Sequence, residues 1–122
     1  SSTIINLFNK VKPPYNINES TQQLALQALA NSKQLTEYVN TTNRLRSELI
    51  QGLSELKSVK KIYPSAANFV LCEFTDANTT YKTLINQGIV VRNRHSVVSE
   101  CLRITVGTAS ENKALLEALA SI

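Results

Sequence analysis

The sequence of 122 residues lacks methionine and tryptophan and is poor in glycine, proline, cysteine and histidine. Three glycines and three prolines are too few for a collagen-like or low-complexity chain. One histidine and two cysteines, with no CxxC pair, do not provide the ligand spacing of a zinc site. We therefore expect a globular protein without a metal centre, and the length predicts one domain with a core of its own.

Long apolar runs are also missing, and no run is long enough to span a bilayer. The N-terminal residues Ser-Ser-Thr-Ile-Ile lack the charged region that precedes the apolar block of a signal peptide. Cys72 and Cys101 lie in or beside predicted strands, where a free thiol behaves as a small apolar side chain. We expect a cytoplasmic protein with reduced thiols and no membrane partner. Because the chain starts without methionine, we also expect a processed or excised piece.

The charge is moderately positive, with 13 lysines and arginines against 9 acidic residues and a net charge of +4. These basic residues are scattered, and no basic arm or RNP-like aromatic motif occurs. An RNA-binding α+β domain would also need aromatic residues on an open sheet face. Phe69 and Phe74 fall on opposite faces of their predicted strand, so we expect no nucleic-acid partner.

Apolar periodicity and capping residues predict the order of the elements. Helical spacing and caps predict helices over about residues 4–11, 19–31, 34–56 and 77–87, and after the capping box Thr108–Glu111. Period-two alternation predicts strands over about 59–63, 66–74, 89–92 and 102–106. Gly88 is expected to end the fourth helix, and prolines after Lys12 end the first and start an extended connector.

This order predicts an α+β fold with a small, mostly antiparallel sheet of three to four strands. The segment from Ala66 to Val91 is a strand-helix-strand unit, which predicts a right-handed parallel crossover. The last strand then returns antiparallel between the two strands of that unit. Helices cover one face of the sheet, and the other face is left for water or another domain.

Arg103 lies in the middle of an apolar strand. Leu102, Ile104 and Val106 point to one face of this strand, and Arg103 points to the other. A guanidinium keeps its charge, and burial without an anion is costly. The sequence therefore predicts a partner for Arg103, which is either a structural carboxylate or a bound anionic ligand.

Four segments occur in family-like order along the chain: Lys12-Pro-Pro-Tyr-Asn-Ile-Asn, Tyr63-Pro-Ser-Ala-Ala-Asn-Phe, Val91-Arg92 and Cys101-Leu-Arg-Ile-Thr-Val-Gly-Thr. Together they resemble the C-terminal part of the histidinol-phosphate aminotransferases, which are pyridoxal-phosphate enzymes of fold type I. The resemblance covers essentially the whole chain. It implies an interdomain helix and connector over residues 1–14 and the aminotransferase small domain over residues 15–122.

The resemblance implies an activity for the whole enzyme. Such an enzyme interconverts histidinol phosphate and imidazole-acetol phosphate with glutamate and 2-oxoglutarate, in histidine biosynthesis. Pyridoxal 5'-phosphate is bound mainly by a large upstream domain, which is the expected partner of this chain, and the full-length enzymes are typically cytoplasmic homodimers. None of the lysines of this chain stands in a Ser-x-x-Lys setting that is followed by a Gly-rich arginine segment, as the Schiff-base lysine of the family does, so we expect the chain to be inactive alone and to hold no catalytic or cofactor-binding residue.

The resemblance also implies positions for substrate binding. The implied substrate-binding residues are Arg103, Arg92, Asn68, Tyr15 and Asn16. Arg103 is similar to the arginine that binds the α-carboxylate of glutamate or the phosphate of histidinol phosphate, and a guanidinium suits both anions. Arg92 is similar to a second phosphate-binding arginine, and Arg94 competes for that role.

A second interpretation is a stand-alone, ferredoxin-like regulatory domain that binds a small anion through Arg103. Such a domain would cover the apolar side chains of its first helix internally, whereas a small domain would leave them for a partner. His95, the only histidine, lies in a polar loop and is expected to be a surface residue without a catalytic role.

Overall fold

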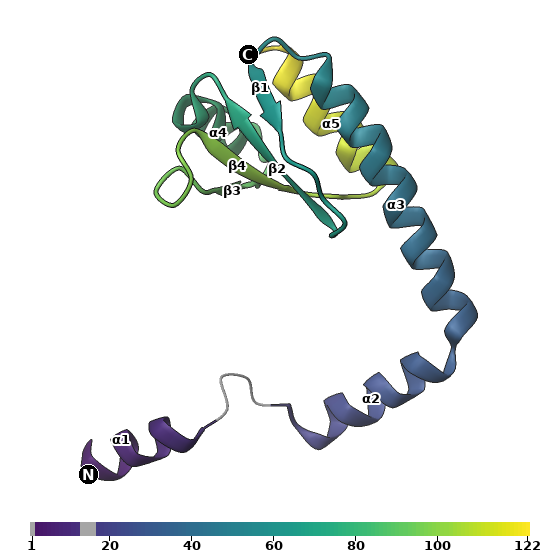
Figure 1. Cartoon of the computed structure of the whole chain (residues 1–122), viewed down its shortest axis with the longest axis vertical. Helices are drawn as coiled ribbons and strands as arrows, with labels where there is room; N and C mark the ends of the chain where they lie inside the picture. Colours follow the sequence, from purple (N-terminus) through teal and green to yellow (C-terminus); the bar gives the residue numbers. More distant parts are fainter. Residues whose placement is uncertain (1, 13–16) are drawn as a thin grey trace. The chain divides into compact units, whose positions relative to one another are not determined.

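A computed structural model describes residues 2–12 and 17–122 of the chain (Figure 1). The chain divides into two compact units, of which the first ends at Thr36 and the second runs from Glu37 to Ile122. The predicted connector after Lys12 lies outside the described residues, and so do Tyr15 and Asn16.

The first unit is helical. It contains α1 (Ser2–Val11) and α2 (Glu19–Ala30), and both helices lie close to their predicted bounds. Asn18 caps α2, because its side-chain oxygen accepts a hydrogen bond of 2.8 Å from the backbone N–H of Thr21. Neither helix holds a buried residue. The apolar side chains of α1 are 57–74% exposed, and they belong to Ile4, Ile5, Leu7, Phe8 and Val11.

The second unit holds most of α3 (Ser32–Ser54), together with α4 (Ala77–Asn86) and α5 (Ala109–Ala120). Helix α3 buries Leu45, Leu49 and Leu53 against the core of this unit, whereas Tyr38 is exposed. Helices α3 and α5 lie side by side (Figure 1), and a Cβ atom at Gly52 would lie 2.5 Å from Leu116 Cδ1. Glycine at this position therefore permits the close approach of the two helices.

The predicted end of α4 at Gly88 and the predicted capping box of α5 are confirmed, and Asp76 caps the start of α4. Asp76 accepts a hydrogen bond of 2.9 Å from the backbone N–H of Thr79, which lowers the pKa of Asp76. Gly88 follows α4 with a φ of 75°, which other residues rarely adopt. At α5, Thr108 and Glu111 form the predicted capping box, because each side chain accepts a hydrogen bond from the backbone of the other.

One four-stranded sheet holds the second unit together. Its strands are β1 (Val59–Ile62), β2 (Phe69–Phe74), β3 (Arg92–Asn93) and β4 (Cys101–Thr105). Their order is β1-β2-β4-β3, and each neighbouring pair is antiparallel. The predicted position of the last strand between β2 and β3 is confirmed, and β2 and β3 consequently run parallel to each other. The α+β fold class is confirmed as well.

Two strands start later than predicted. Strand β2 begins at Phe69 because Ser65 folds the preceding residues into a turn: its hydroxyl donates to Phe69 O and accepts from Ala67 N. Strand β3 begins at Arg92, and residues 89–91 lie outside the ladder. The β-branched residues before Arg92 suit a strand in composition but do not pair in one.

Alternation along β2 and β4 separates a core face from an open face. The core contains Val70, Cys72, Phe74, Leu102 and Ile104 from these strands, packed with residues of α3, α4 and α5. The open face carries the alternate residues Phe69, Leu71, Glu73, Cys101, Arg103 and Thr105. The helices therefore cover one face, as the sequence predicts, and Arg103 lies on the other.

The two cysteines are free and buried, and they lie on opposite faces of the sheet. Burial raises the pKa of Cys72 to about 12. Burial, followed by the charge of Glu73, also raises the pKa of Cys101. Both side chains remain neutral thiols at neutral pH and are poor nucleophiles.

Candidate functional site

Arg103 lies at the centre of β4, which is an inner strand of the sheet. It is opposite Leu71 of β2 on one side and opposite Arg92 of β3 on the other. Directly opposed residues of an antiparallel pair point to the same face. The structure therefore brings Arg103 and Arg92, two of the predicted binding residues, together on the open face.

The guanidinium of Arg103 is not neutralised by the described residues. Its Nε is buried and has no hydrogen-bond partner in residues 2–12 and 17–122. No carboxylate oxygen of these residues lies within 4.0 Å of its nitrogens. Its Cζ lies 5.0 Å from the centroid of the Phe69 ring, a contact worth about 0.5–2 kcal/mol. An aromatic face attracts the cation but cannot accept bidentate hydrogen bonds, so the arginine is suited to an anion.

Arg92 is exposed on the edge strand β3. Like charges that face each other across two strands destabilise the pair, and an anion bound to both would remove this repulsion. Arg94 lies beside Cys101 rather than beside Arg103, because its backbone N–H donates to Cys101 O at 2.9 Å. The register thus places Arg92, rather than Arg94, beside Arg103.

Asn68 lies just before β2, and its carbonyl accepts a hydrogen bond of 2.9 Å from Val106 N. Its exposed side chain lines a hollow of about 270 Å³ that Arg46 of α3 also lines. Arg46 Nη1 donates to Ala67 O at 3.0 Å and thereby ties α3 to this segment. Asn68 therefore lines a hollow that contains neither Arg103 nor Arg92.

Phe69 is a site residue that the sequence analysis missed. Alternation along β2 is the signal that places its ring on the open face, but contact with Arg103 also depends on the β2–β4 register. Glu100 was missed as well. It precedes β4, and its side chain accepts a hydrogen bond of 2.8 Å from the backbone N–H of Ala77 at the start of α4.

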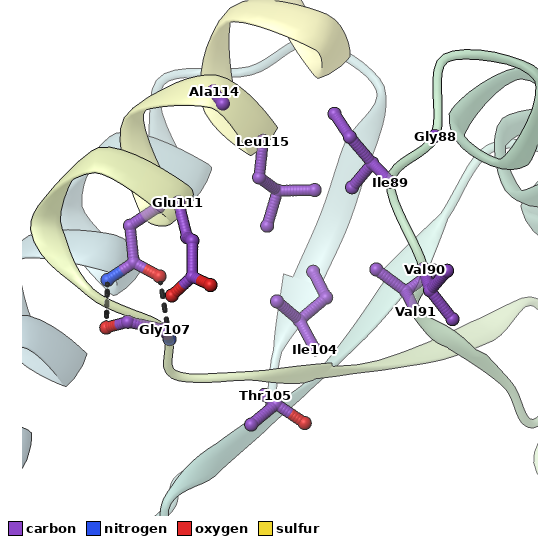
Figure 2. A pocket seen from close by; sticks show the side chains of 11 residues that line it. Gly88, Ile89, Val90, Val91, Ile104, Thr105, Gly107, Glu111, Ala114 and Leu115 are labelled. Carbon is purple, nitrogen blue, oxygen red and sulfur yellow. Dashed lines mark hydrogen bonds between the residues drawn. The ribbon is translucent and has the colours of Figure 1, made fainter.

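A second hollow, of about 350 Å³, lies between the segment after α4, the end of β4 and α5 (Figure 2). Apolar side chains such as Ile89, Ile104 and Leu115 line much of it, and Glu111 is its charged lining residue. The Asn112 side chain is hydrogen-bonded to the backbone of Gly107: its Oδ1 accepts from Gly107 N at 2.9 Å, and its Nδ2 donates to Gly107 O at 3.3 Å. Without a cation, this hollow does not suit an anionic ligand.

Comparison with known proteins identifies the family. Residues 1–119 match the family described as aminotransferase class I and II. The chain belongs to this family. The family resemblance that the sequence predicts is thereby confirmed, and the candidate site can be considered as part of an aminotransferase fold.

Individual aminotransferases show the extent of the similarity. The chain is 44% identical to a histidinol-phosphate aminotransferase of Flavobacterium psychrophilum over 124 residues, which cover 100% of the chain and 36% of that protein. It is 43% identical to a histidinol-phosphate aminotransferase of Bacteroides fragilis, with 98% of the chain and 35% of that protein covered. The chain thus spans about a third of the length of the curated relatives it matches.

Solved structures agree on the fold. The structure of the histidinol-phosphate aminotransferase from Clostridium acetobutylicum matches with a TM-score of 0.80 and 23% identity over 90% of this chain and 34% of that one. A decarboxylase from Sulfurospirillum multivorans matches with a TM-score of 0.71 and 26% identity over 99% of this chain and 36% of that one. Members of the fold with different described activities therefore share this architecture.

The family implies a pyridoxal-phosphate cofactor, and the residues of this chain do not fit covalent attachment of that group. A lysine that forms a Schiff base is normally desolvated, whereas every lysine of this aminotransferase chain is exposed. Among the described residues, no group of three or more His, Cys, Asp or Glu side chains could hold a metal ion. The same residues include no helix long and apolar enough to cross a membrane. What the site does offer is the arginine pair, which is suited to an anionic substrate.

Proposed function

We propose that the chain is the C-terminal small domain of a pyridoxal-phosphate-dependent transaminase of histidine biosynthesis. The substrates would be histidinol phosphate and glutamate, with imidazole-acetol phosphate and 2-oxoglutarate as the corresponding keto compounds. Residues 15–122 would form the small domain, and residues 1–14 would join it to the large domain. The observation that carries the proposal is the guanidinium of Arg103, which lies on the open sheet face with a buried, unpaired Nε among the described residues.

Arg103 would hold the anionic end of the substrate. In one half-reaction it would bind the α-carboxylate of glutamate, and in the other the phosphate of histidinol phosphate. A planar guanidinium forms two parallel hydrogen bonds to either group, so one residue serves both substrates. The Phe69 ring would hold the guanidinium of Arg103 in place through its cation–π contact, and Arg92 would supply a second positive charge for the phosphate.

The remaining parts of the enzyme are part of the proposal. Pyridoxal phosphate, when bound, supplies the electron sink for transamination. We place its attachment in a large domain upstream of this chain, since the lysines of the chain are exposed. The isolated chain would then be inactive, and the active enzyme would be a cytoplasmic homodimer. Similarity to histidinol-phosphate aminotransferases at 41–44% identity supports the choice of substrate.

Substitution of Arg103 in the full-length enzyme tests the proposal. We expect Arg103→Ala to lower kcat/KM for both glutamate and histidinol phosphate by roughly a hundredfold, because a charged hydrogen-bonded contact worth about 3 kcal/mol is lost. Arg103→Lys keeps the charge but not the fork, and we expect an intermediate loss.

Arg44→Ala is the matched control, because Arg44 is exposed and pairs with Glu48 on its own helix at 2.7 Å. Its kinetics should equal those of the unsubstituted enzyme. Turnover of both substrates at the normal rate in Arg103→Ala would disprove the anion-binding role of Arg103.

A further inference from the structure

Strand β3 is too short to hold Arg92 in place by itself. It consists of Arg92 and Asn93, which pair with Arg103 and Leu102. Strands in globular proteins usually have at least three residues. On the preceding side the chain leaves the ladder, and Val90 is 82% exposed. The strand also opposes Arg92 to Arg103, and this like-charge pair works against the pairing.

Glu100, at the other end of the loop between β3 and β4, is held in an unusual conformation. Its φ is 55°, and among the residues that the structure describes no other non-glycine residue has a positive φ. A glutamate seldom adopts this conformation, which is costly for its backbone. In this conformation Glu100 accepts two hydrogen bonds. Its side-chain Oε2 accepts from Ala77 N at 2.8 Å, and its backbone carbonyl accepts from Phe74 N at 2.8 Å.

His95 connects Glu100 to the end of β3. Its Nδ1 accepts a hydrogen bond of 3.1 Å from the backbone N–H of Glu100 and lies 3.3 Å from Glu100 Oε1. Its own backbone N–H donates to Asn93 Oδ1 at 2.8 Å, and Asn93 Nδ2 donates to Asn78 Oδ1 at 2.9 Å. Two links therefore run from this loop to the first turn of α4, and His95 joins them.

We propose that Glu100 and His95 are positioning residues for Arg92. They fasten the loop between β3 and β4 to α4 and so keep a two-residue strand in register against the repulsion between Arg92 and Arg103. This inference rests on the proposed function, in which both arginines bind the phosphate of the substrate. Neither Glu100 nor His95 touches the substrate; they act through the position of Arg92.

The test uses the full-length enzyme and histidinol phosphate as the probe. Glu100→Gly tolerates the positive φ and removes the side-chain hydrogen bond to Ala77 N, so the loop loses this link to α4 without backbone strain. We expect KM for histidinol phosphate to rise about tenfold, with kcat changed less than twofold, because substrate binding weakens while the chemistry is unaffected. KM for glutamate, whose α-carboxylate is held by Arg103 in the proposed function, should stay within a factor of about two.

A double-mutant cycle with Arg92→Ala separates positioning from general destabilisation. If Glu100 acts through Arg92, then Glu100→Gly adds no further increase in KM once Arg92 is removed. Glu117→Gln is the control for the loss of an exposed carboxylate, since Glu117 pairs with Lys113 at 3.7 Å in the same helix, and its kinetics should be unchanged. Glu100→Asn, whose residue type also tolerates a positive φ, replaces Glu100→Gly if that protein fails to fold.

The outcomes are distinguishable. A tenfold effect of Arg92→Ala, with an independent and additive effect of Glu100→Gly, would overturn the positioning role and leave the proposed function intact. An unchanged KM in Glu100→Gly and Glu100→Asn, beside a raised KM in Arg92→Ala, would overturn it as well. An unchanged KM in Arg92→Ala would remove Arg92 from the proposed function, and the positioning role with it.

Discussion

The two units of the chain use their apolar side chains in opposite ways. In the second unit, Leu49, Leu53 and the inward residues of β2 and β4 are almost completely buried. In the first unit, α1 and α2 bury nothing, although α1 is clearly amphipathic, with Leu7 and Phe8 on its apolar side. Isolated helices of 10–12 residues are marginal in water even with good sequences. The comparison indicates that the second unit carries its own stability and that the first depends on a surface supplied from outside it.

Truncation of a leucine in each unit should show the largest contrast. We expect Leu53→Ala, at a position that is 0% exposed, to reduce the free energy of unfolding of the chain by about 2–5 kcal/mol. Leu26→Ala, at a position that is 61% exposed, should change it by less than about 0.5 kcal/mol. Urea unfolding followed by circular dichroism measures both. Equal losses would show that α2 is packed as tightly as α3.

A charge on the apolar side of α1 should affect association rather than folding. Exposed apolar side chains are prone to associate, and a fully buried Phe is worth about 1.5–3 kcal/mol. We expect Phe8→Glu to weaken self-association of the chain by at least about tenfold in sedimentation equilibrium. Lys10→Glu, in the same helix, is the matched control and should weaken it less. A chain that is monomeric at high concentration before substitution would contradict the idea that α1 needs a partner surface.

The caps should give the smallest effects. Thr108→Ala, at the start of α5, should cost about 1 kcal/mol of unfolding free energy, because α5 belongs to the cooperative core of the second unit. Asn18→Ala removes an equivalent contact to Thr21 N–H but should reduce only the local helicity of α2. Hydrogen exchange of the two helices distinguishes these results, and global destabilisation by Asn18→Ala would count against the division into two units.

The α5 cap also predicts a pH dependence. The backbone N–H of Thr108 donates to Glu111 and lowers the pKa of this carboxyl. A lowered pKa in the folded state means that the contribution is present above the ordinary pKa of glutamate and is lost as the pH falls through the lower, folded value. Glu111→Gln should therefore make the free energy of unfolding depend less on pH in the acidic range, as urea unfolding at a series of pH values would measure.

Much of the fold follows from local rules in the sequence. The capping box Thr108–Glu111, the Asp76 cap and Gly88 mark the helix ends within one or two residues, because capping depends on neighbouring residues alone. Alternation along β2 and β4 separates the core face from the open face for the same reason. The late start of β3 could not be predicted, since Val90 and Val91 have a strand-like composition and pairing depends on the path of β4.

The site was partly predictable. Alternation and the apolar surroundings single out Arg103 in the sequence. Among the described residues no carboxylate pairs with it, which favours a bound anionic ligand over a structural ion pair as its partner. Its neighbours Arg92 and Phe69 depend on the registers of two strand pairs. In particular, the β3–β4 register is set by the loop that Glu100 and His95 fold. The side chain of His95 is 38% exposed, and hydrogen bonds to Asn93 and Glu100 also hold it within this loop.

The shortness of β3 has a consequence for solubility. Edge strands with free backbone groups are templates for pairing with other chains, and proteins protect them with short strands, bulges and positive charges. Both edges of this sheet have such protection. At one edge β3 has two residues, one of which is Arg92, and at the other β1 carries Lys60, Lys61 and an irregular register between Val59 and Lys61. Intermolecular β-sheet growth is thereby disfavoured, and copies of the chain that do meet should do so through helix α1.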